Sequence, residues 1–444
     1  MILGVLIIAM LVLLFLRVPV AISMLLPCLC YVTWSPDITL GVALQQTVGS
    51  VDSFPLLAVP LFIMTGYLSN AGGLADRLFR MLLILFKKIP GNLGFVNVFS
   101  SLMFSWMSGA AIADAAGLGS VLVPAMKKRG YDEKFALGLT GASSLIGPIM
   151  PPSIPAIVYA VSAGVSVGAL FFAGVLPALV LTAILCIFVY RDARKNPLRE
   201  EAIAQNVPVA DDSAAGRLSV PHELMSSRTY SIKSALPVLL TPVIILGGIL
   251  GGIFTPTEAA AAAVMWVLIL SFFYRSLSFE AFRGVLVKTT TTTGSIMLIV
   301  AAAGLFGWVI AREQGPQAVT EAMLQFTDNP IVFLLLVNVV LLMTGMILEP
   351  VAGLLITVPV LLPAAIEFGI DPLHLGIVMI LNLVLGLLTP PVGLVLYVLS
   401  SVTGSSVQTV TRGTVPFLIP LLITLLLITF IPAFSLWLPG LLAK

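Results

Sequence analysis

Two proline pairs interrupt long apolar segments, and they are the feature of this sequence best suited to ion chemistry. They lie in GPIMPPS (147–153) and GLLTPPVG (386–393). Proline has no backbone N–H, so a proline pair inside a helix frees carbonyl groups upstream, and in hydrocarbon those carbonyls need partners. A cation can be that partner, while the following half-helix offers N–H groups to an anion. Each pair therefore predicts a broken helix beside an ion or substrate. The alternative is a proline kink that only shapes packing.

Polar residues also lie at the centre of two other apolar segments, SWMSGAAIADAAGLG (105–119) and MTGMILEPVAG (343–353). Asp114 and Glu349 are ionisable residues in apolar surroundings, where burial is expensive and usually functional, although either carboxylate could instead cap a helix. The candidate polar or backbone-exposing groups are Ser105, Ser108, Gly109 and Asp114 in the first segment, and Thr344, Gly345, Glu349 and Pro350 in the second.

Three further polar residues precede the proline pairs. Ser143 and Asn382 are 239 residues apart, and Ser144 follows Ser143. These side chains could hydrogen-bond a substrate, or they could hydrogen-bond between neighbouring helices. The sequence alone leaves both roles open.

The composition places these residues in a lipid bilayer. Of 444 residues, 59% are hydrophobic and 9% are charged, with mean hydropathy +1.13, whereas soluble domains carry about 25% charged residues. A crossing helix needs about 20 apolar residues, so the length accommodates roughly ten crossings and re-entrant segments. The net charge of +2 is too small for nucleic-acid binding, so no nucleic-acid partner is expected. The chain is predicted to be an all-α polytopic membrane protein.

Apolar runs mark the expected elements. Ten runs are predicted to cross the membrane: 1–16, 18–34, 54–68, 135–160, 170–190, 236–254, 259–273, 289–310, 375–399 and 415–438. Segments 94–126 and 331–363 contain the polar centres described above and are expected to be re-entrant hairpins. Residues 191–233 are polar and are predicted to form an extramembrane loop. Segments 74–89 and 277–288 mix basic and apolar residues, as interfacial amphipathic helices do.

Charge placement predicts the orientation. With the N-terminus outside and both hairpins returning to their own side, 20 of the 22 Lys and Arg residues fall inside, and only Arg312 and Lys444 fall outside. This split follows the positive-inside rule, and a hairpin that crossed fully would disturb it. Both termini are therefore predicted to be periplasmic, and the loop 191–233 cytoplasmic.

A fixed shift of 239 residues relates the two halves. Seven Gly or Pro positions recur at this shift: Pro124, Gly130, Gly147, Pro151, Pro152, Gly174 and Pro177 match Pro363, Gly369, Gly386, Pro390, Pro391, Gly413 and Pro416. In the predicted orientation the first copy begins outside and the second inside, so the repeats are inverted. Inverted repeats with interrupted helices are typical of secondary transporters, which bind substrate and ions near the midplane.

Four segments together resemble the large membrane subunit of the tripartite ATP-independent periplasmic (TRAP) transporters. They are GGIFTPTEAAAAA (251–263), SGAAIADAAGLG (108–119), IGPIMPPS (146–153) and LLTPPVG (387–393). The resemblance implies a sodium-driven importer of organic anions, usually carboxylates or sialic-acid-like sugars, in the bacterial inner membrane. It also implies a periplasmic substrate-binding protein, a small four-helix membrane subunit and an elevator mechanism.

The resemblance also implies a division of the chain. It comprises N-terminal scaffold helices (1–53), a first inverted repeat (54–190) with hairpin 94–126 and broken helix 135–160, the loop 191–233, scaffold helices (234–275) and a second inverted repeat (276–444) with hairpin 331–363 and broken helix 375–399.

The expected sites follow from the same resemblance. Sodium site 1 would comprise Ser105, Ser108, Gly109, Asp114, Gly147 and Pro148, and sodium site 2 would comprise Thr344, Gly345, Glu349, Gly386 and Thr389. The anion would contact Ser143, Ser144, Pro151, Pro152, Ser153, Asn382, Pro390 and Pro391.

Other functions fit the sequence less well. No GxxxxGK[ST] motif is present, which leaves coupling to an ion gradient as the energy source. A membrane enzyme would need a nucleophile with a base, or clustered metal ligands, and the two histidines, His222 and His374, lie outside the predicted crossing runs. No enzymatic activity is therefore expected. A stand-alone ion-coupled anion symporter that uses no binding protein is the main alternative.

Overall fold

The computed structural model describes residues 2–195 and 228–442, and the regular structure in these residues is entirely helical. Most of the predicted loop 191–233 lies outside the described residues. The all-α prediction is confirmed, and seven helices are long and apolar enough to cross a membrane: 54–71, 167–195, 256–273, 279–312, 330–347, 350–367 and 407–430.

The first half contains ten α-helices and one 3₁₀ turn, η1, within residues 2–195. They are α1 (Ile2–Phe15), α2 (Val20–Trp34), α3 (Leu40–Gly49), η1 (Phe54–Leu57), α4 (Ala58–Ala71), α5 (Leu74–Leu85), α6 (Asn92–Ser108), α7 (Ala111–Lys128), α8 (Glu133–Ser144), α9 (Ile154–Ala163) and α10 (Val167–Lys195).

The second half, within residues 228–442, is built similarly. Its helices are α13 (Arg228–Leu250), α14 (Pro256–Phe273), α15 (Phe279–Arg312), α16 (Gly315–Phe326), α17 (Pro330–Ile347), α18 (Pro350–Glu367), α19 (Pro372–Gly386), α20 (Leu394–Thr403), α21 (Val407–Phe430) and α22 (Ala433–Leu442).

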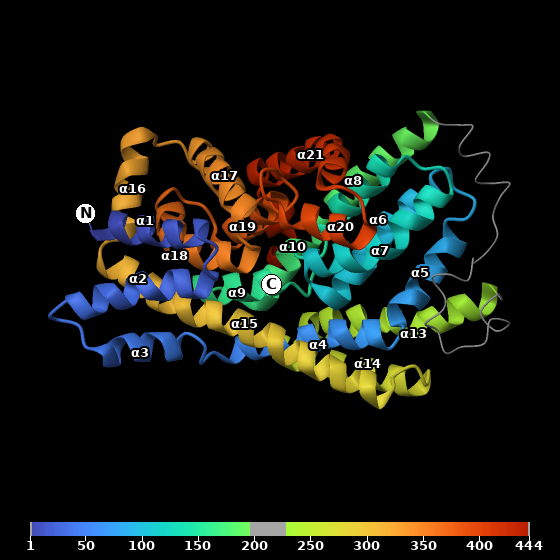
Figure 1. Cartoon of the computed structure of the whole chain (residues 1–444), viewed down its shortest axis with the longest axis horizontal. Coiled ribbons are helices and arrows are strands. Elements are labelled where there is room, and N and C mark those ends of the chain that lie inside the picture. Colours follow the sequence, from blue (N-terminus) through green and yellow to red (C-terminus); the bar gives the residue numbers. More distant parts are fainter. Residues whose placement is uncertain (1, 196–227, 443–444) are drawn as a thin grey trace.

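Two helical hairpins occupy the predicted positions. Helices α6 and α7 are joined by a turn at Gly109 and Ala110, and helices α17 and α18 by a turn at Leu348 and Glu349. The first hairpin packs against α8 and the second against α19. Figure 1 shows the first hairpin toward one end of the long axis and the second toward the other, with α19 between them.

The helices form two layers, visible in Figure 1. One layer contains the hairpins and the broken helices α8–α9 and α19–α20. The other, named the long-helix layer after α13 and α15, contains α4, α13, α14 and α15, with α2 and α3 packed against α15. Helix α14 begins with a capping box in which Thr255 Oγ1 accepts from the Glu258 N–H and the Thr255 N–H donates to the Glu258 carboxylate.

Helices α5 and α16 connect the long-helix layer to the hairpins. Two contacts fix the corner before α5. Ser276 Oγ donates to the Gly72 carbonyl at 2.7 Å, and the Arg77 guanidinium stacks on Tyr274, 3.9 Å from the ring centroid. The corner before α16 is held by a hydrogen bond from the Tyr31 hydroxyl to Glu313. Each connecting helix is therefore fixed at its end nearest the long helices.

Two predicted element boundaries were wrong. The segment 277–288 is not a separate interfacial helix, because it forms the start of the 34-residue α15. The run 415–438 is broken after Phe430, and α22 begins only at Ala433. Helices α1 and α2 occupy the predicted runs 1–16 and 18–34, but their 14 and 15 residues are fewer than the roughly 20 of a full crossing.

Candidate functional site

The first break separates α8 from α9 and is fully buried. Residues 141–158 are all buried. Ser153 is the N-cap of α9: its hydroxyl accepts from the Ala156 N–H at 3.1 Å and donates to the Pro148 carbonyl. Ser153 and Pro148 were predicted to contact ligands. In the structure these two residues hydrogen-bond each other.

The tip of the first hairpin closes on this break. Gly109 has φ +59°, and a Cβ atom on it would lie 2.5 Å from the Pro152 carbonyl oxygen. The glycine is required for both reasons, since a side chain would be strained in this backbone conformation and would meet the backbone of the break. The predicted residues Gly109 and Pro152 are thus in contact.

Asp114 lies beside the same break. The Ser108 hydroxyl donates to Asp114 Oδ1, whereas Oδ2 is buried and has no hydrogen-bond partner. A Cβ atom on Gly147 would lie 2.5 Å from Asp114 Oδ2, so this oxygen faces the start of the break. Asp114 does not cap α7, whose N-cap is Ala110. An unpartnered carboxylate oxygen beside exposed backbone suits a cation.

The predicted site 1 is therefore partly assembled. The structure brings Ser108, Gly109, Asp114 and Gly147 together. Ser105 lies one turn earlier and its hydroxyl donates to the Leu102 carbonyl of its own helix at 2.5 Å.

The second tip approaches the second break through two glycines. A Cβ atom on Gly345 would lie 2.6 Å from the Leu383 carbonyl oxygen, and one on Gly386 would overlap the backbone of Gly345. The Gly393 N–H donates to the Met346 carbonyl at 3.3 Å. The structure therefore joins Gly345 and Gly386, as predicted for site 2.

The side chains predicted for site 2 have local partners. Glu349 caps α18 by accepting from the Val351 N–H at 3.2 Å. The hydroxyls of Thr344 and Thr389 donate to carbonyls four residues earlier, at 2.8 and 2.9 Å. Glu349 also does not match Asp114 in the repeat, because the residue 239 positions after Asp114 is Gly353.

The two breaks differ in exposure. Pro151 and Pro152 are buried, whereas Pro390 is half-buried and Pro391 is exposed together with Val392. Of the residues predicted to contact the anion, only Pro390 and Pro391 are not fully buried.

Two of the three remaining polar candidates join helices. Ser143 accepts from Ser101 at 2.8 Å and donates to Asn97 Oδ1 at 2.9 Å. Asn382 Nδ2 donates to Asn338 Oδ1 at 2.7 Å, and Ser144 donates to the Gly141 carbonyl at 2.8 Å. Ser143 and Asn382 therefore follow the interhelical alternative that the sequence left open, whereas Ser144 bonds within its own helix α8.

Sequence reasoning missed Asn97, Ser101 and Asn338 as partners. Asn97 and Ser101 lie four residues apart on α6, a spacing that places polar side chains on one helix face and could have identified them.

Comparison with known proteins identifies the family. Residues 7–434 match the model of the tripartite ATP-independent periplasmic transporter, DctM component. The chain is 42% identical to the sialic acid TRAP transporter large permease protein SiaM of Vibrio cholerae, covering 97% of this chain and 96% of that protein. It is 39% identical to the C4-dicarboxylate TRAP transporter large permease protein DctM of Pseudomonas aeruginosa, covering 92% and 91%.

A solved structure has the same fold. The YdaH transporter of Alcanivorax borkumensis matches with a TM-score of 0.63 and 17% identity over 91% of each chain. At this identity the likeness concerns the fold alone. The sequence matches extend over nearly the whole chain, and from them we conclude that this multi-pass membrane protein belongs to the DctM component family of the tripartite ATP-independent periplasmic transporters.

Proposed function

We propose that this chain is the large membrane subunit of a sodium-coupled importer of an organic anion, either a carboxylate or a sialic-acid-like sugar. The observation that carries the sodium coupling is the Oδ2 atom of Asp114, which is buried, has no hydrogen-bond partner and faces Gly147. A buried carboxylate oxygen without a partner is costly, and a bound cation offsets that cost. Carboxylate, hydroxyl and carbonyl oxygens are the ligands that hard cations take.

The second break is the better place for the anion. Pro391 and Val392 are exposed there, and the positive end of the α20 dipole begins directly after the break, although the N–H groups of Val395 and Leu396 already donate to the carbonyls of Leu387 and Gly393. The relatives that transport sialic acid and C4-dicarboxylates, according to their names, support these two substrate classes.

The proposed assembly has three parts. A periplasmic substrate-binding protein delivers the anion, and a small four-helix membrane subunit completes the scaffold in the inner membrane, with both termini of this chain periplasmic. The hairpins and broken helices move as one body against the long-helix layer, in an elevator mechanism. The support for this motion is the two-layer arrangement, in which α5 and α16 connect the layers in the two halves.

Transport in proteoliposomes tests the proposal. Vesicles holding this chain and its small subunit receive radiolabelled sialic acid or a C4-dicarboxylate, with and without an inward sodium gradient and the binding protein. Uptake that requires both the gradient and the binding protein is expected. Uptake driven by the gradient without any binding protein would instead support the stand-alone symporter, and uptake indifferent to sodium would overturn the coupling.

A further inference from the structure

A chain of buried hydrogen bonds joins four helices in the second half. Asn382 on α19 donates to Asn338 on α17 at 2.7 Å, and Asn338 Nδ2 donates to Thr429 Oγ1 on α21 at 3.1 Å. His374, at the start of α19, contacts the Thr429 carbonyl through Nε2 at 3.2 Å and Ser435 Oγ on α22 through Nδ1 at 2.7 Å. All five side chains are buried.

The directions of these hydrogen bonds determine which side of the Asn382 amide carries the NH2 group and which carries the oxygen. Its Nδ2 lies 2.7 Å from the Val378 carbonyl, which can only accept, so the NH2 group must be on that side. The second hydrogen of this NH2 group goes to Asn338 Oδ1, which orients the NH2 group of Asn338 toward Thr429. Asn382 Oδ1 is left buried and without a hydrogen-bond partner.

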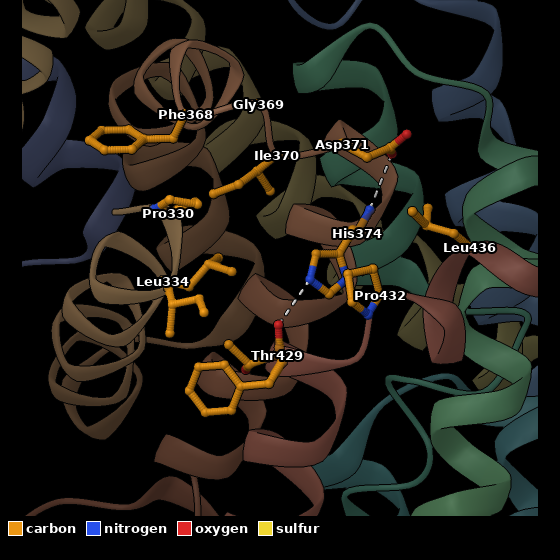
Figure 2. Close-up of a pocket in the computed structure, with 12 residues that line it drawn as sticks. Pro330, Leu334, Phe368, Gly369, Ile370, Asp371, His374, Thr429, Pro432 and Leu436 are labelled. Carbon is orange, nitrogen blue, oxygen red and sulfur yellow. Dashed lines mark hydrogen bonds between the residues drawn. The ribbon is translucent and has the colours of Figure 1, made fainter. Parts of the chain in front are cut away.

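His374 holds the far end of this chain. Helix α21 ends at Phe430, so the Thr429 carbonyl is one of the last four, which have no partner within the helix. Because that carbonyl only accepts, Nε2 of His374 must hold a proton. Figure 2 shows the His374 ring directed at Thr429, beside a cavity of about 290 Å³ at the base of the second hairpin.

The first half has no such arrangement at the matching positions. The residue 239 positions before His374 is Phe135, which packs against Tyr131 and Phe417. The residue that matches Asn382 is Ser143, whose hydroxyl both donates and accepts. Among these matched positions, the unpartnered oxygen belongs to the second half.

We propose that His374 and Asn338 are positioning residues that hold the amide oxygen of Asn382 free, as an acceptor for a second coupling cation, which would bind beside the second break in addition to the one at Asp114. Asn382 is fully buried, which suits a small dehydrated ion and not an organic substrate. A carbonyl oxygen also repels the carboxylate oxygens of an anion. The next residue, Leu383, directs its carbonyl at Gly345 of the second tip, so Asn382 adjoins the tip contact.

This inference rests on the proposed sodium coupling, and it is tested by sodium binding without transport. The thermal stability of the purified transporter is titrated with sodium, using choline as the reference cation. Thr429→Val removes the Oγ1 that accepts from Asn338, and we expect a half-saturating sodium concentration about tenfold higher. Thr429→Ser restores the hydroxyl and should return this concentration close to the wild-type value.

The matched control is Thr424→Val on the same helix. Thr424 is also buried, but its hydroxyl donates to the Pro420 carbonyl and takes no part in the chain. It should leave the half-saturating concentration unchanged. His374→Gln, which keeps an N–H donor, and His374→Leu, which does not, provide a second pair if Thr429→Val fails to fold.

The outcomes separate the two proposals. A wild-type protein that is not stabilised by sodium relative to choline would overturn the sodium coupling itself. If sodium stabilises the wild-type protein, and Thr429→Val and His374→Leu have the same half-saturating sodium concentration as the wild type, the positioning role is overturned and the sodium coupling stands.

Discussion

Asp114 lies against Gly147, with one carboxylate oxygen bonded to Ser108 and the other facing the start of the first break without a partner. The hairpin thus supplies a carboxyl group and the broken helix supplies backbone. The two groups come from separate helices, so a cation bound between them would hold the hairpin tip to the break.

Replacing this carboxyl group tests the sodium site proposed at the first break. Asp114→Asn keeps the shape of the side chain and removes the carboxylate that we propose binds sodium. We expect the half-saturating sodium concentration for uptake to rise at least about tenfold, equivalent to about 1.4 kcal/mol. Sodium titration of uptake measures it. Asp132→Asn, at an exposed position with no side-chain cap, is the matched control. Unchanged sodium activation in Asp114→Asn would remove Asp114 from the site.

Closure of the first tip depends on Gly109. In Gly109→Ala the new Cβ would meet the Pro152 carbonyl, and the positive φ costs a further ~1–2 kcal/mol. Gly164→Ala separates these effects, because Gly164 has φ +67° with no neighbouring atom within 4 Å. We expect uptake to fall strongly in Gly109→Ala and weakly in Gly164→Ala. Equal losses in the two variants would show that backbone strain, and not closure of the tip, is responsible.

The hairpins and breaks could be predicted from the sequence because their signals are local. A polar centre in an apolar segment and a proline pair each act on the few residues around them, and the turns at Gly109 and Leu348 fall within the predicted hairpins. The capping box at Thr255 is equally local, since its partner lies three residues away. The 239-residue repeat then matched the hairpin and broken helix of the first half to those of the second half.

The partners of the polar side chains could not be predicted in this way. Asn382 contacts Asn338, 44 residues earlier, and His374 contacts Ser435, 61 residues later. Such pairs depend on how whole helices pack, and single residues do not encode that. The break before α22 was missed because apolar residues continue on both sides of Pro432, so hydropathy does not change there.

The second tip depends on a close approach of two backbones. In Gly345→Ala the methyl group would lie 2.6 Å from the Leu383 carbonyl, and overpacking of this kind typically costs about 1–3 kcal/mol. Gly294→Ala is the control, because that helical glycine has no neighbour within 4 Å and alanine favours the helix by about 1 kcal/mol. Thermal melting should show destabilisation only in Gly345→Ala. A stabilised Gly345→Ala protein would contradict the observed contact.

Acid should weaken the junction between α7, α8 and the turn before α21. Glu133 accepts from Lys127 Nζ at 2.7 Å and from Ser405 Oγ at 2.6 Å, and these bonds, Lys127 first, lower the pKa of Glu133 below its ordinary value of 4.5. A lowered folded-state pKa contributes stability above the unfolded-state pKa, and this contribution is lost as pH falls through the folded-state pKa. The melting temperature of Glu133→Gln should therefore lie slightly below that of the wild type at neutral pH, and the difference should be small because the ion pair is exposed. This difference should vanish as the pH falls below 4.5. Melting curves across this pH range measure the difference. Lys128→Gln is the control for loss of a neighbouring charge. A difference that stays constant down to pH 3 would show that the ionised form of Glu133 contributes nothing to the junction.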